Sequence, residues 1–416
     1  MRFIADFHLH SKFSRATSKD MEVETLARWA KKKGISLLGT GDFTHPTYFA
    51  DLRAKLAPLS NGLFELKKGE KAVKFILTTE VSNIYHQDGK VRRIHNLIFV
   101  PSFEVAEAIR SKLGNLGKLS SDGRPIFTFT AKELLKMILD ISGDCLVIPA
   151  HAWTPWFSIF GANSGFDSIE ECFGDLSSYI CAIETGLSSD PEMNWRLSAL
   201  DRITLLSNSD AHSPTRLGRE ANAFACPLDY KEITETIRKK DRKKFLFTIE
   251  FFPEEGKYHY DGHRQCGVLF SPSQTKANKL LCPSCQKKLT VGVMHRVEVL
   301  SDRPEGFVPK SAIPSIHLIP LEEIIAEAMG YRVGTKTAEA EYERLIERGG
   351  SEFQILLDAA PEDLASFVPA KTLEGIIRMR QGKVSIIPGH DGVYGKITLF
   401  PEKKEEGEAK EQLKLF

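Results

Sequence analysis

The first 228 residues alternate short apolar runs with segments of helical periodicity. The apolar runs span 36–40, 75–79, 96–100, 146–150, 180–183, 203–206 and 222–226. The helical segments lie near 22–34, 46–57, 103–114, 131–141, 192–200 and 229–240. Strands that alternate with helices indicate parallel β/α units, and about seven such units predict an α/β barrel with its chemistry at the strand ends.

This pattern stops near residue 229. A basic stretch, 238–244, leads into an apolar run at 245–252 and then a segment that contains cysteines. Residues 231–310 hold 16 Lys plus Arg against 10 Asp plus Glu. Helical periodicity returns at 321–330, 338–348, 352–359 and 371–380. We therefore predict a barrel (1–228), a basic linker with a cysteine module (229–300), a mostly helical domain (301–400) and a charged tail (401–416).

Composition narrows the class of protein. With 42% hydrophobic and 27% charged residues, the 416-residue chain can bury a sizeable core. A net charge of +1 does not support binding of nucleic acid through the charge of the whole protein. Only local basic patches could bind it electrostatically. The sequence has neither an apolar run of 18 residues nor a signal-peptide pattern, so we expect a cytoplasmic protein without a membrane partner. The sequence does not determine the oligomeric state, and we favour a monomer. Its seven cysteines do not form a disulfide pattern.

Most of the predicted strand ends carry side chains that bind metals. These are His8, His10, Asp42, His45, Glu80, His95, His151, Glu184, Asp210 and His212. Residues two apart in a strand point the same way, so His8 with His10, and Asp210 with His212, could each chelate one ion. A single histidine here is more often a hydrogen-bonded core residue. The whole set at consecutive strand ends, without thiolate, is typical of catalytic Zn, Mn or Fe.

The ordered motifs resemble those of the polymerase and histidinol phosphatase (PHP) family. They are His8-x-His10-Ser11, Thr40-Gly41-Asp42, Glu80, His95, His151 and Asp210-x-His212. The resemblance covers about residues 1–228 and implies a distorted seven-stranded β/α barrel that hydrolyses phosphoesters with two or three divalent metals (Zn, Mn or Mg). Two departures predict that one of three metal sites is incomplete: Ser14-Arg15-Ala16-Thr17 stands where many members have a ligand, and Asp42 is followed by Phe43, with the histidine at His45.

These residues predict a catalytic centre made of His8, His10, Glu80, His151, Asp210 and His212. A carboxylate such as Glu80 or Asp210 can bridge two ions while imidazoles complete the shell, so that metal-activated water replaces a side-chain nucleophile. Arg15, Arg216 and Arg219 lie near these motifs in the sequence and suit a phosphate, although surface salt bridges are the alternative.

A second motif has the spacing of a structural zinc site. His263-x2-Cys266 is followed after fifteen residues by Cys282-x2-Cys285, with His259 as the alternative to His263. Basic residues accompany this motif: Lys276, Lys279, Lys287, Lys288 and Arg296. They are predicted to contact DNA phosphates, and a solvated face is the alternative.

The zinc motif and the helical domain together make the chain similar to the endonuclease Q branch of the PHP family. That similarity implies nicking of DNA 5′ to deaminated bases (hypoxanthine, uracil or xanthine) or abasic sites. Candidates for contacting the lesion are His390, Asp391 and Tyr394 in a turn-rich segment, and Trp153 and Trp156 after His151; a linking turn and ordinary packing are the alternatives. A small-molecule phosphomonoesterase and a non-catalytic DNA-binding scaffold are the alternative functions.

The tail ends in an apolar pentapeptide, Gln412 to Phe416, after a stretch of Glu and Lys. Gln412, an aliphatic residue and an aromatic residue resemble part of the peptide with which repair enzymes bind the sliding clamp. The alternatives are a frayed end, or Leu413 and Phe416 packed on the body of the protein.

Overall fold

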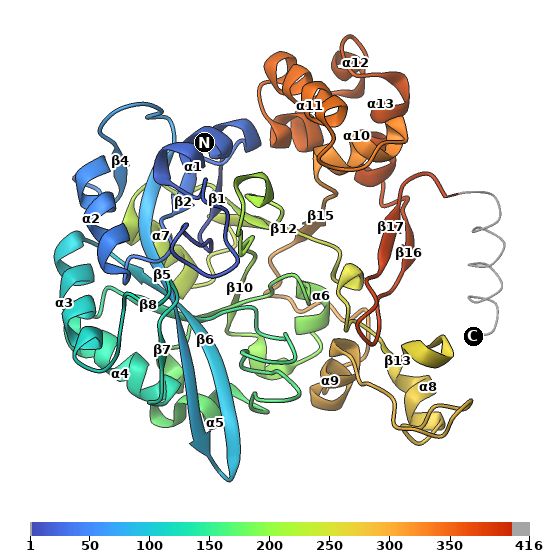
Figure 1. Cartoon of the computed structure of the whole chain (residues 1–416), viewed down its shortest axis with the longest axis horizontal. Coiled ribbons are helices and arrows are strands. Elements are labelled where there is room, and N and C mark those ends of the chain that lie inside the picture. The colour runs from blue at the N-terminus through green and yellow to red at the C-terminus, as the bar shows by residue number, and fades with distance from the viewer. Residues whose placement is uncertain (1, 402–416) are drawn as a thin grey trace.

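The computed structural model describes residues 2–401, and a mixed sheet wraps into a barrel in its N-terminal half (Figure 1). Strand β1 (Phe3–Asp6) lies between β11 (Ala221–Phe224) and β2 (Leu37–Gly39), and the sheet continues through β5 (Lys74–Gln87) and β6 (Lys90–Val100) to β8 (Leu146–Pro149). Strands β9 (Ala182–Glu184) and β10 (Thr204–Leu206) form a separate parallel pair. Each predicted apolar run forms a strand, and β1 is a further strand that was not among these runs.

Side chains, not a strand ladder, connect β10 to β11. The Asn222 side chain accepts from the Ser207 amide (3.0 Å) and donates to the Ser207 carbonyl (2.6 Å). An amide side chain offers both a donor and an acceptor, so it can replace one pair of backbone hydrogen bonds. These bonds therefore join β10 to β11, and the barrel is distorted at this seam.

Helices cover the outside of the sheet. They are α1 (Val23–Lys33), α2 (Pro46–Lys55), α3 (Phe103–Gly114), α4 (Ala131–Ile141), α5 (Ile169–Phe173), α6 (Pro191–Asn194) and α7 (Tyr230–Arg238). The helix predicted at 192–200 is instead α6 followed by a 3₁₀ turn at Ser198–Leu200. Thr130 and Glu133 form a capping box that fixes the start of α4.

The β5–β6 connection differs from the predicted parallel unit. These two strands are antiparallel and form a long hairpin, and β6 is also antiparallel to β8 (Figure 1). Asp88 and Gly89 at its tip have φ angles of 53° and 72°. Positive φ at both central residues is typical of the tight hairpin turn that Asp-Gly favours. Shorter strands complete this region: β3 (Leu56–Pro58), β4 (Phe64–Leu66) and β7 (Ile126–Phe127).

The sheet extends past residue 228, where we predicted the barrel to end. Strand β12 (Phe245–Glu250) pairs antiparallel with β11, and β15 (Ser315–His317) pairs parallel with β12. Segments predicted to belong to the linker and to the helical domain are therefore part of the barrel sheet.

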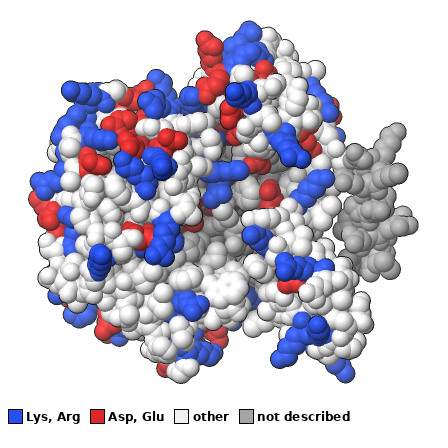
Figure 2. Space-filling view, viewed as in Figure 1, with Lys and Arg blue, Asp and Glu red and all other residues white. Residues whose placement is uncertain are grey.

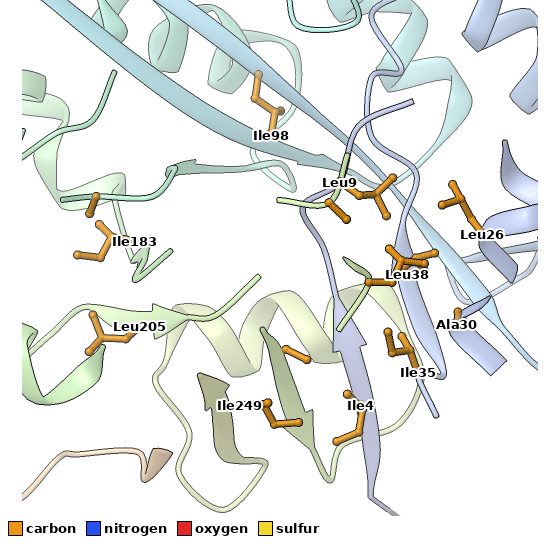
Figure 3. Packing of buried hydrophobic residues seen from close by; sticks show 14 of the residues in the cluster. Ile4, Leu9, Leu26, Ala30, Ile35, Leu38, Ile98, Ile183, Leu205 and Ile249 are labelled. Carbon is orange, nitrogen blue, oxygen red and sulfur yellow. The ribbon is translucent and has the colours of Figure 1, made fainter. Parts of the chain in front are cut away.

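Two apolar clusters hold the barrel together. The larger packs residues such as Ile4, Leu38 and Ile249 of the sheet against Leu26 and Ala30 of α1 (Figure 3). The second includes Phe7, which lies 5.0 Å from Phe99 and 6.1 Å from Phe224 between ring centroids. Complete burial of each such ring contributes about 1.5–3 kcal/mol. Most of the polar side chains described below follow the carboxyl ends of strands, whereas Glu80 and His95 lie within β5 and β6.

Three smaller elements follow the barrel (Figure 1). The first contains β13 (Asp261–His263), β14 (Val268–Phe270), α8 (Pro272–Ala277) and α9 (Val293–Leu300). The second contains α10 (Leu321–Met329), α11 (Lys336–Gly349), α12 (Pro361–Leu364) and α13 (Ala370–Arg380), with a π-helical turn at Gln354–Asp358. The third is a hairpin of β16 (Ser385–Ile387) and β17 (Lys396–Thr398), which lies between the other two in this view.

A buried ion pair joins the helical part to the barrel. Lys33 at the end of α1 lies 2.6 Å from Glu352, whose carboxylate also accepts from the Tyr342 hydroxyl and the Leu321 amide. Both charges are almost fully enclosed, so loss of either partner would leave a costly unpaired charge. Among the helices of residues 2–401, none is long and apolar enough to cross a membrane.

Candidate active site

Most of the predicted metal ligands come together in the barrel, although Glu80 and His95 lie within long strands and not at the strand ends where we predicted them. Two groups form: His8, His10 and Asp210, and Glu80, His95 and His151, with the ligand atoms of each group within 4.8 Å of one another. We call these six residues the barrel centre. Asp42, His151 and Asp210 have left-handed φ angles of 44°, 32° and 46°. Such strained backbone is concentrated at functional sites, where the surrounding structure holds it in place.

Glu80 connects the two groups. Its Oε1 lies 2.8 Å from His95 Nδ1 and 3.1 Å from His151 Nε2, and its Oε2 lies 3.3 Å from His10 Nε2. His8 Nε2 is 3.7 Å from the same Oε2. One carboxylate thus faces imidazoles of both groups, as a carboxylate that bridges two ions would.

Asp210 completes the first group. Its Oδ1 lies 3.2 Å from His10 Nε2 and 3.7 Å from His8 Nε2. These three buried atoms have no well-formed hydrogen bond within residues 2–401. Buried polar atoms normally have partners, and an imidazole–carboxylate donor set fits a divalent metal. The residues present therefore suit the ions that the motifs imply.

Asp42 and Glu184, which we predicted to be metal ligands, instead contact the Nδ1 atoms of His10 and His8. Asp42 Oδ1 lies 3.1 Å from His10 Nδ1, and its Oδ2 accepts from the hydroxyls of Ser11 and Ser14. Glu184 lies 2.9 Å from His8 Nδ1. A carboxylate on Nδ1 fixes the tautomer that leaves Nε2 free to bind metal.

Further hydrogen bonds hold these carboxylates in place. Asn208 donates to Glu184 (2.7 Å), and the His151 amide donates to the same carboxylate (3.0 Å). Asn222 donates to Asn208 (3.0 Å), so the seam of the barrel supports the centre. Sequence analysis missed Ser14 and both asparagines, because their spacing in the chain does not reveal which carboxylate they contact.

Two other predicted ligands lie at or beyond the edge of the centre. His45 caps α2 by accepting from the Tyr48 amide and stacks on Phe13 at 4.4 Å, and it belongs to neither group of ligand atoms in the described chain. The His212 ring lies 4.6 Å from that of His10, and about one third of its side chain is exposed. Neither residue belongs to the two groups of ligand atoms in the described chain, although His212 lies beside the first group, and both stay predictions as metal ligands.

The electrostatics of the centre describe its metal-free form. Burial opposes ionisation of Glu80, but His95, Arg124 and His8 hold its pKa well below the usual range. Burial also disfavours the imidazolium of His8 and His10, yet neighbouring carboxylates raise both pKa values well above the ordinary value. Burial lowers the pKa of His95 to about 4. Metal binding would displace the protons of His8 and His10, because a bound imidazole must be neutral.

Arg124 reaches the barrel centre with its guanidinium group, and sequence analysis did not identify it. Arg124 lies 2.9 Å from Glu80 Oε2, whereas Arg15 is 81% exposed and pairs with Asp122 at 3.3 Å. Two predicted phosphate ligands have other partners: Arg216 pairs with Glu323 of α10 (2.8 Å), and Arg219 donates to the carbonyls of Ser209 and Asp210. Arg219 thus holds the strained Asp210 turn.

The zinc motif also comes together. His263, Cys266, Cys282 and Cys285 place their ligand atoms within 4.8 Å of one another, and His263 Nδ1 lies 3.6 Å from Cys285 Sγ. We call segment 261–290 the zinc module. Burial opposes ionisation of the Cys282 thiol, but the amides of Cys285 and Ser284 lower its pKa to about 6, which favours a thiolate ligand. His259 does not belong to this group of the described residues.

The basic residues near the module differ in what they contact. Lys279, Lys287 and Lys288 are exposed, and Lys276 pairs with Glu298 at 3.2 Å. Arg296 instead donates to the carbonyls of Phe160 and Phe166 and pairs with Asp167, so it fixes α9 to the barrel. Figure 2 shows Lys and Arg side chains on both sides of a hollow between the barrel and the C-terminal half of the chain.

The aromatic residues that we predicted to contact the lesion differ in their exposure. Trp153 is 1% exposed, donates to Asn194 (2.8 Å) and packs on Phe160, so it belongs to the core. Trp156 is 42% exposed and meets the Tyr258 ring edge-on at 6.1 Å. Tyr394 is 69% exposed, and Lys257 lies over its ring. These exposed rings are available for stacking.

The other two residues of the turn-rich segment join the hairpin to the zinc module. Asp391 accepts from the Arg264 amide (2.8 Å) and the Thr290 hydroxyl (2.6 Å), so both of its oxygens have partners. His390 forms a bridge with Tyr260. The loop that connects β16 to β17 therefore contacts the module.

The chain is similar to several known proteins. The family model described as the MJ0043 C-terminal domain matches residues 320–383. The uncharacterized protein YqxK of Bacillus subtilis is 31% identical over 411 residues, which is 95% of this chain and 99% of YqxK. The uncharacterized protein MJ0043 of Methanocaldococcus jannaschii is 36% identical over 262 residues, 61% of this chain, but the match covers only 32% of that longer protein.

Two solved structures are similar over nearly the whole chain. Lesion-specific endonuclease Q from Pyrococcus furiosus has a TM-score of 0.85 and 33% identity, and the match covers 98% of this chain and 99% of that one. An endonuclease Q bound to a 27-mer duplex with an abasic lesion at the active site has a TM-score of 0.84 and 34% identity, with 97% and 98% covered. The chain therefore belongs to the endonuclease Q branch of the PHP family.

Proposed function

We propose that this chain is a metal-dependent DNA repair endonuclease. It would hydrolyse the phosphodiester 5′ to a deaminated base (hypoxanthine, uracil or xanthine) or an abasic site, leaving 3′-hydroxyl and 5′-phosphate ends. The observation that carries the proposal is the Glu80-centred cluster of imidazoles and carboxylates in the barrel of a chain that is similar to endonuclease Q along its length. The complex of a relative with abasic DNA supports the substrate.

Two divalent ions, Zn, Mn or Mg, fit the two groups of ligand atoms. His8, His10 and Asp210 would hold one, His95 and His151 the other, and Glu80 both. We infer two ions and not three, because Ser14 contacts Asp42 and His45 caps a helix. When bound, such ions activate water and offset the charge that develops on a phosphate.

The protein's own side chains orient this chemistry. Asp42 and Glu184 hold His10 and His8 with Nε2 toward the cluster, which reduces the reorganisation needed when a substrate binds. Arg124 lies at the cluster with a partly exposed guanidinium and can hold a non-bridging phosphate oxygen. His212 lies at the exposed edge, where its imidazole can hold or release a proton.

Exposed residues of the zinc module, of the loop between β16 and β17 and of the barrel supply the DNA contacts in this proposal. Lys279, Lys287 and Lys288 would contact the phosphate backbone, and Trp156 and Tyr394 would stack on an extruded nucleotide. One structural Zn²⁺ bound by His263, Cys266, Cys282 and Cys285 would hold the module that carries the lysines.

A nicking assay tests the function. Duplexes that contain an abasic site, hypoxanthine, uracil or xanthine, and an undamaged duplex, are incubated with the full chain and Mn²⁺ or Mg²⁺. We expect a single cut on the 5′ side of the lesion and none in the undamaged duplex. Hydrolysis of a small phosphomonoester in place of damaged DNA would favour the phosphatase alternative. DNA binding without turnover of either substrate would favour the scaffold.

The clamp contact concerns residues outside the described part of the chain. We propose that Gln412 to Phe416 bind a sliding clamp and raise the local concentration of the nuclease on DNA. Calorimetric titration of the full chain and of a chain without 412–416 against the clamp tests this. Equal affinities, or no binding by either form, would contradict it. A monomer stays a prediction that sedimentation can test.

A further inference from the structure

A group of metal-binding side chains lies outside both centres described above. Asp190, Glu192 and His317 place one ligand atom each within 4.8 Å of one another. Asp190 and Glu192 belong to the start of α6, whereas His317 ends β15, more than 120 residues later in the sequence. We call these three residues the Asp190 cluster. Tertiary structure alone brings them together.

The strand register places a buried carboxylate beside this cluster. Glu250 and His317 are direct partners in the parallel β12–β15 pair. Glu250 is 0% exposed; its Oε2 accepts from the Thr185 hydroxyl at 3.1 Å, and its Oε1 has no hydrogen-bond partner in residues 2–401. An unpartnered buried carboxylate oxygen is costly, so its presence indicates a ligand that the protein itself does not provide.

His259, the rejected alternative for the zinc motif, belongs to the same region. It is 4% exposed, and its Nδ1 has no hydrogen-bond partner in the described chain. It lines a small pocket together with Ser188, two residues before Asp190.

An ion pair explains only part of this arrangement. His317 Nε2 lies 3.4 Å from Asp190 Oδ2, and Glu192 accepts from the Ser315 hydroxyl at 2.7 Å. Neither contact satisfies Glu250 Oε1 or His259 Nδ1. A divalent cation would satisfy carboxylate and imidazole atoms together, and the mixture of nitrogen and oxygen ligands favours a transition metal over Mg²⁺ or Ca²⁺.

We propose that Asp190, Glu192 and His317 bind a divalent transition-metal ion such as Zn²⁺ or Mn²⁺, with Glu250 and His259 as additional or hydrogen-bonding partners. The ion would join α6 of the barrel to β15, the strand that leads into the helical part. Its role would be structural, because it would fix the C-terminal half of the chain relative to the barrel centre.

Metal counting tests the proposal. The full chain is produced with Zn²⁺ or with Mn²⁺, separated from free metal and analysed by mass spectrometry, alongside the double variant Asp190→Asn, His317→Gln. Asp190 caps α6 by accepting from the Met193 amide, and Asn keeps that cap. We expect the variant to lose one metal per chain. His86→Gln, a change at an exposed histidine outside the described metal groups, should keep the full count.

Anomalous diffraction from crystals of the unaltered chain provides a measurement that does not depend on how the variant folds. We expect a peak at the Zn or Mn absorption edge about 2.0–2.2 Å from His317 Nε2 and an Asp190 oxygen. Absence of that peak would overturn the proposal whatever the count, and an unchanged count in a folded variant would overturn it as well. The cluster would then be a hydrated ion pair.

Discussion

The barrel centre and the zinc module both gather metal-binding side chains, but different forces hold them. The ligands of the barrel centre extend from strands packed over two large apolar clusters, and buried carboxylates orient their imidazoles. The zinc module has a core of only three buried apolar residues, Val268, Cys282 and Leu289, one of which is itself a predicted ligand.

Because their cores differ in size, the two regions would depend on metal in different ways. A fold with a large core can position metal ligands before the metal arrives, so the ion serves chemistry. A segment that buries so little apolar surface cannot offset the entropy of ordering its chain, so metal binding supplies folding free energy. Loss of a barrel ligand should therefore affect activity more than stability, and loss of a module ligand should do the reverse.

Asp210→Asn should have the largest effect. It removes a negative charge from the barrel centre and keeps the shape of the side chain, so nicking of abasic DNA should fall about a hundredfold to a thousandfold. DNA binding in a gel shift and the thermal midpoint should stay unchanged, because the module and both apolar clusters are intact. Parallel losses of DNA binding and nicking would show that the barrel is a binding platform. His151→Ala is expected to behave in the same way.

Cys282→Ser tests whether the zinc module needs its metal to fold. The variant should lose one zinc per chain, and proteases should cut within 261–290 before they cut the barrel. The thermal midpoint should fall by about 5 °C, while the metals of the barrel centre remain. Cys181→Ser, outside the module, is the control. If the variant keeps its zinc and its resistance to proteolysis, the module folds without metal.

Asp42→Asn tests whether hydrogen bonds prepare the barrel centre. Asn carries no negative charge, and its NH₂ group cannot accept from the Ser11 amide and the Ser11 and Ser14 hydroxyls as Asp42 Oδ2 does, so it holds His10 less firmly. The affinity for the catalytic metal should therefore fall about tenfold to a hundredfold. Titration of Mn²⁺ against nicking rate measures this, and saturating metal should restore most of the rate. Asp20→Asn, on an exposed loop, is the matched control. A normal titration curve for Asp42→Asn would mean that the core alone positions His10.

Glu255→Gln should have the smallest effect and a defined pH dependence. Burial, with the charge of Glu323, raises the pKa of Glu255 to about 8 from an ordinary 4.5. The folded state thus favours the neutral acid, so stability falls as pH rises from 4.5 to about 8 and changes little above that. Gln cannot ionise, so Glu255→Gln should be more stable than the unaltered chain by about 2 kcal/mol at pH 8, after allowance for partial exposure. At low pH the two chains should be equally stable.

Urea titrations near the two ends of this pH range measure the effect, with the exposed Glu347→Gln as control. An equal free energy of unfolding for Glu255→Gln and the unaltered chain at pH 8 would contradict the pKa shift. Glu255 lies beside the hairpin, since the Gly395 amide donates to its carbonyl, so the result reports on the packing of the C-terminal half.

Sequence by itself determined the features that depend on local pattern. Apolar runs predicted the strands of the barrel, and helical periodicity predicted α3 and α4 with the bounds that the structure has. The motifs predicted the set of side chains that the structure gathers into two groups, His8, His10 and Asp210, and Glu80, His95 and His151. Alternation of side chains along a strand and the burial of apolar faces are properties of short segments, so they are visible in a linear sequence.

Tertiary structure alone decided which partner each polar side chain has. It turned Asp42 and Glu184 toward the outer nitrogens of two histidines, used Arg219 and Arg296 to hold backbone, and buried Trp153. It also brought His317 to Asp190. Hydrogen bonds and ion pairs act over a few ångströms in space, and the approach of segments far apart in the chain is set by the packing of the whole core, which local pattern does not encode.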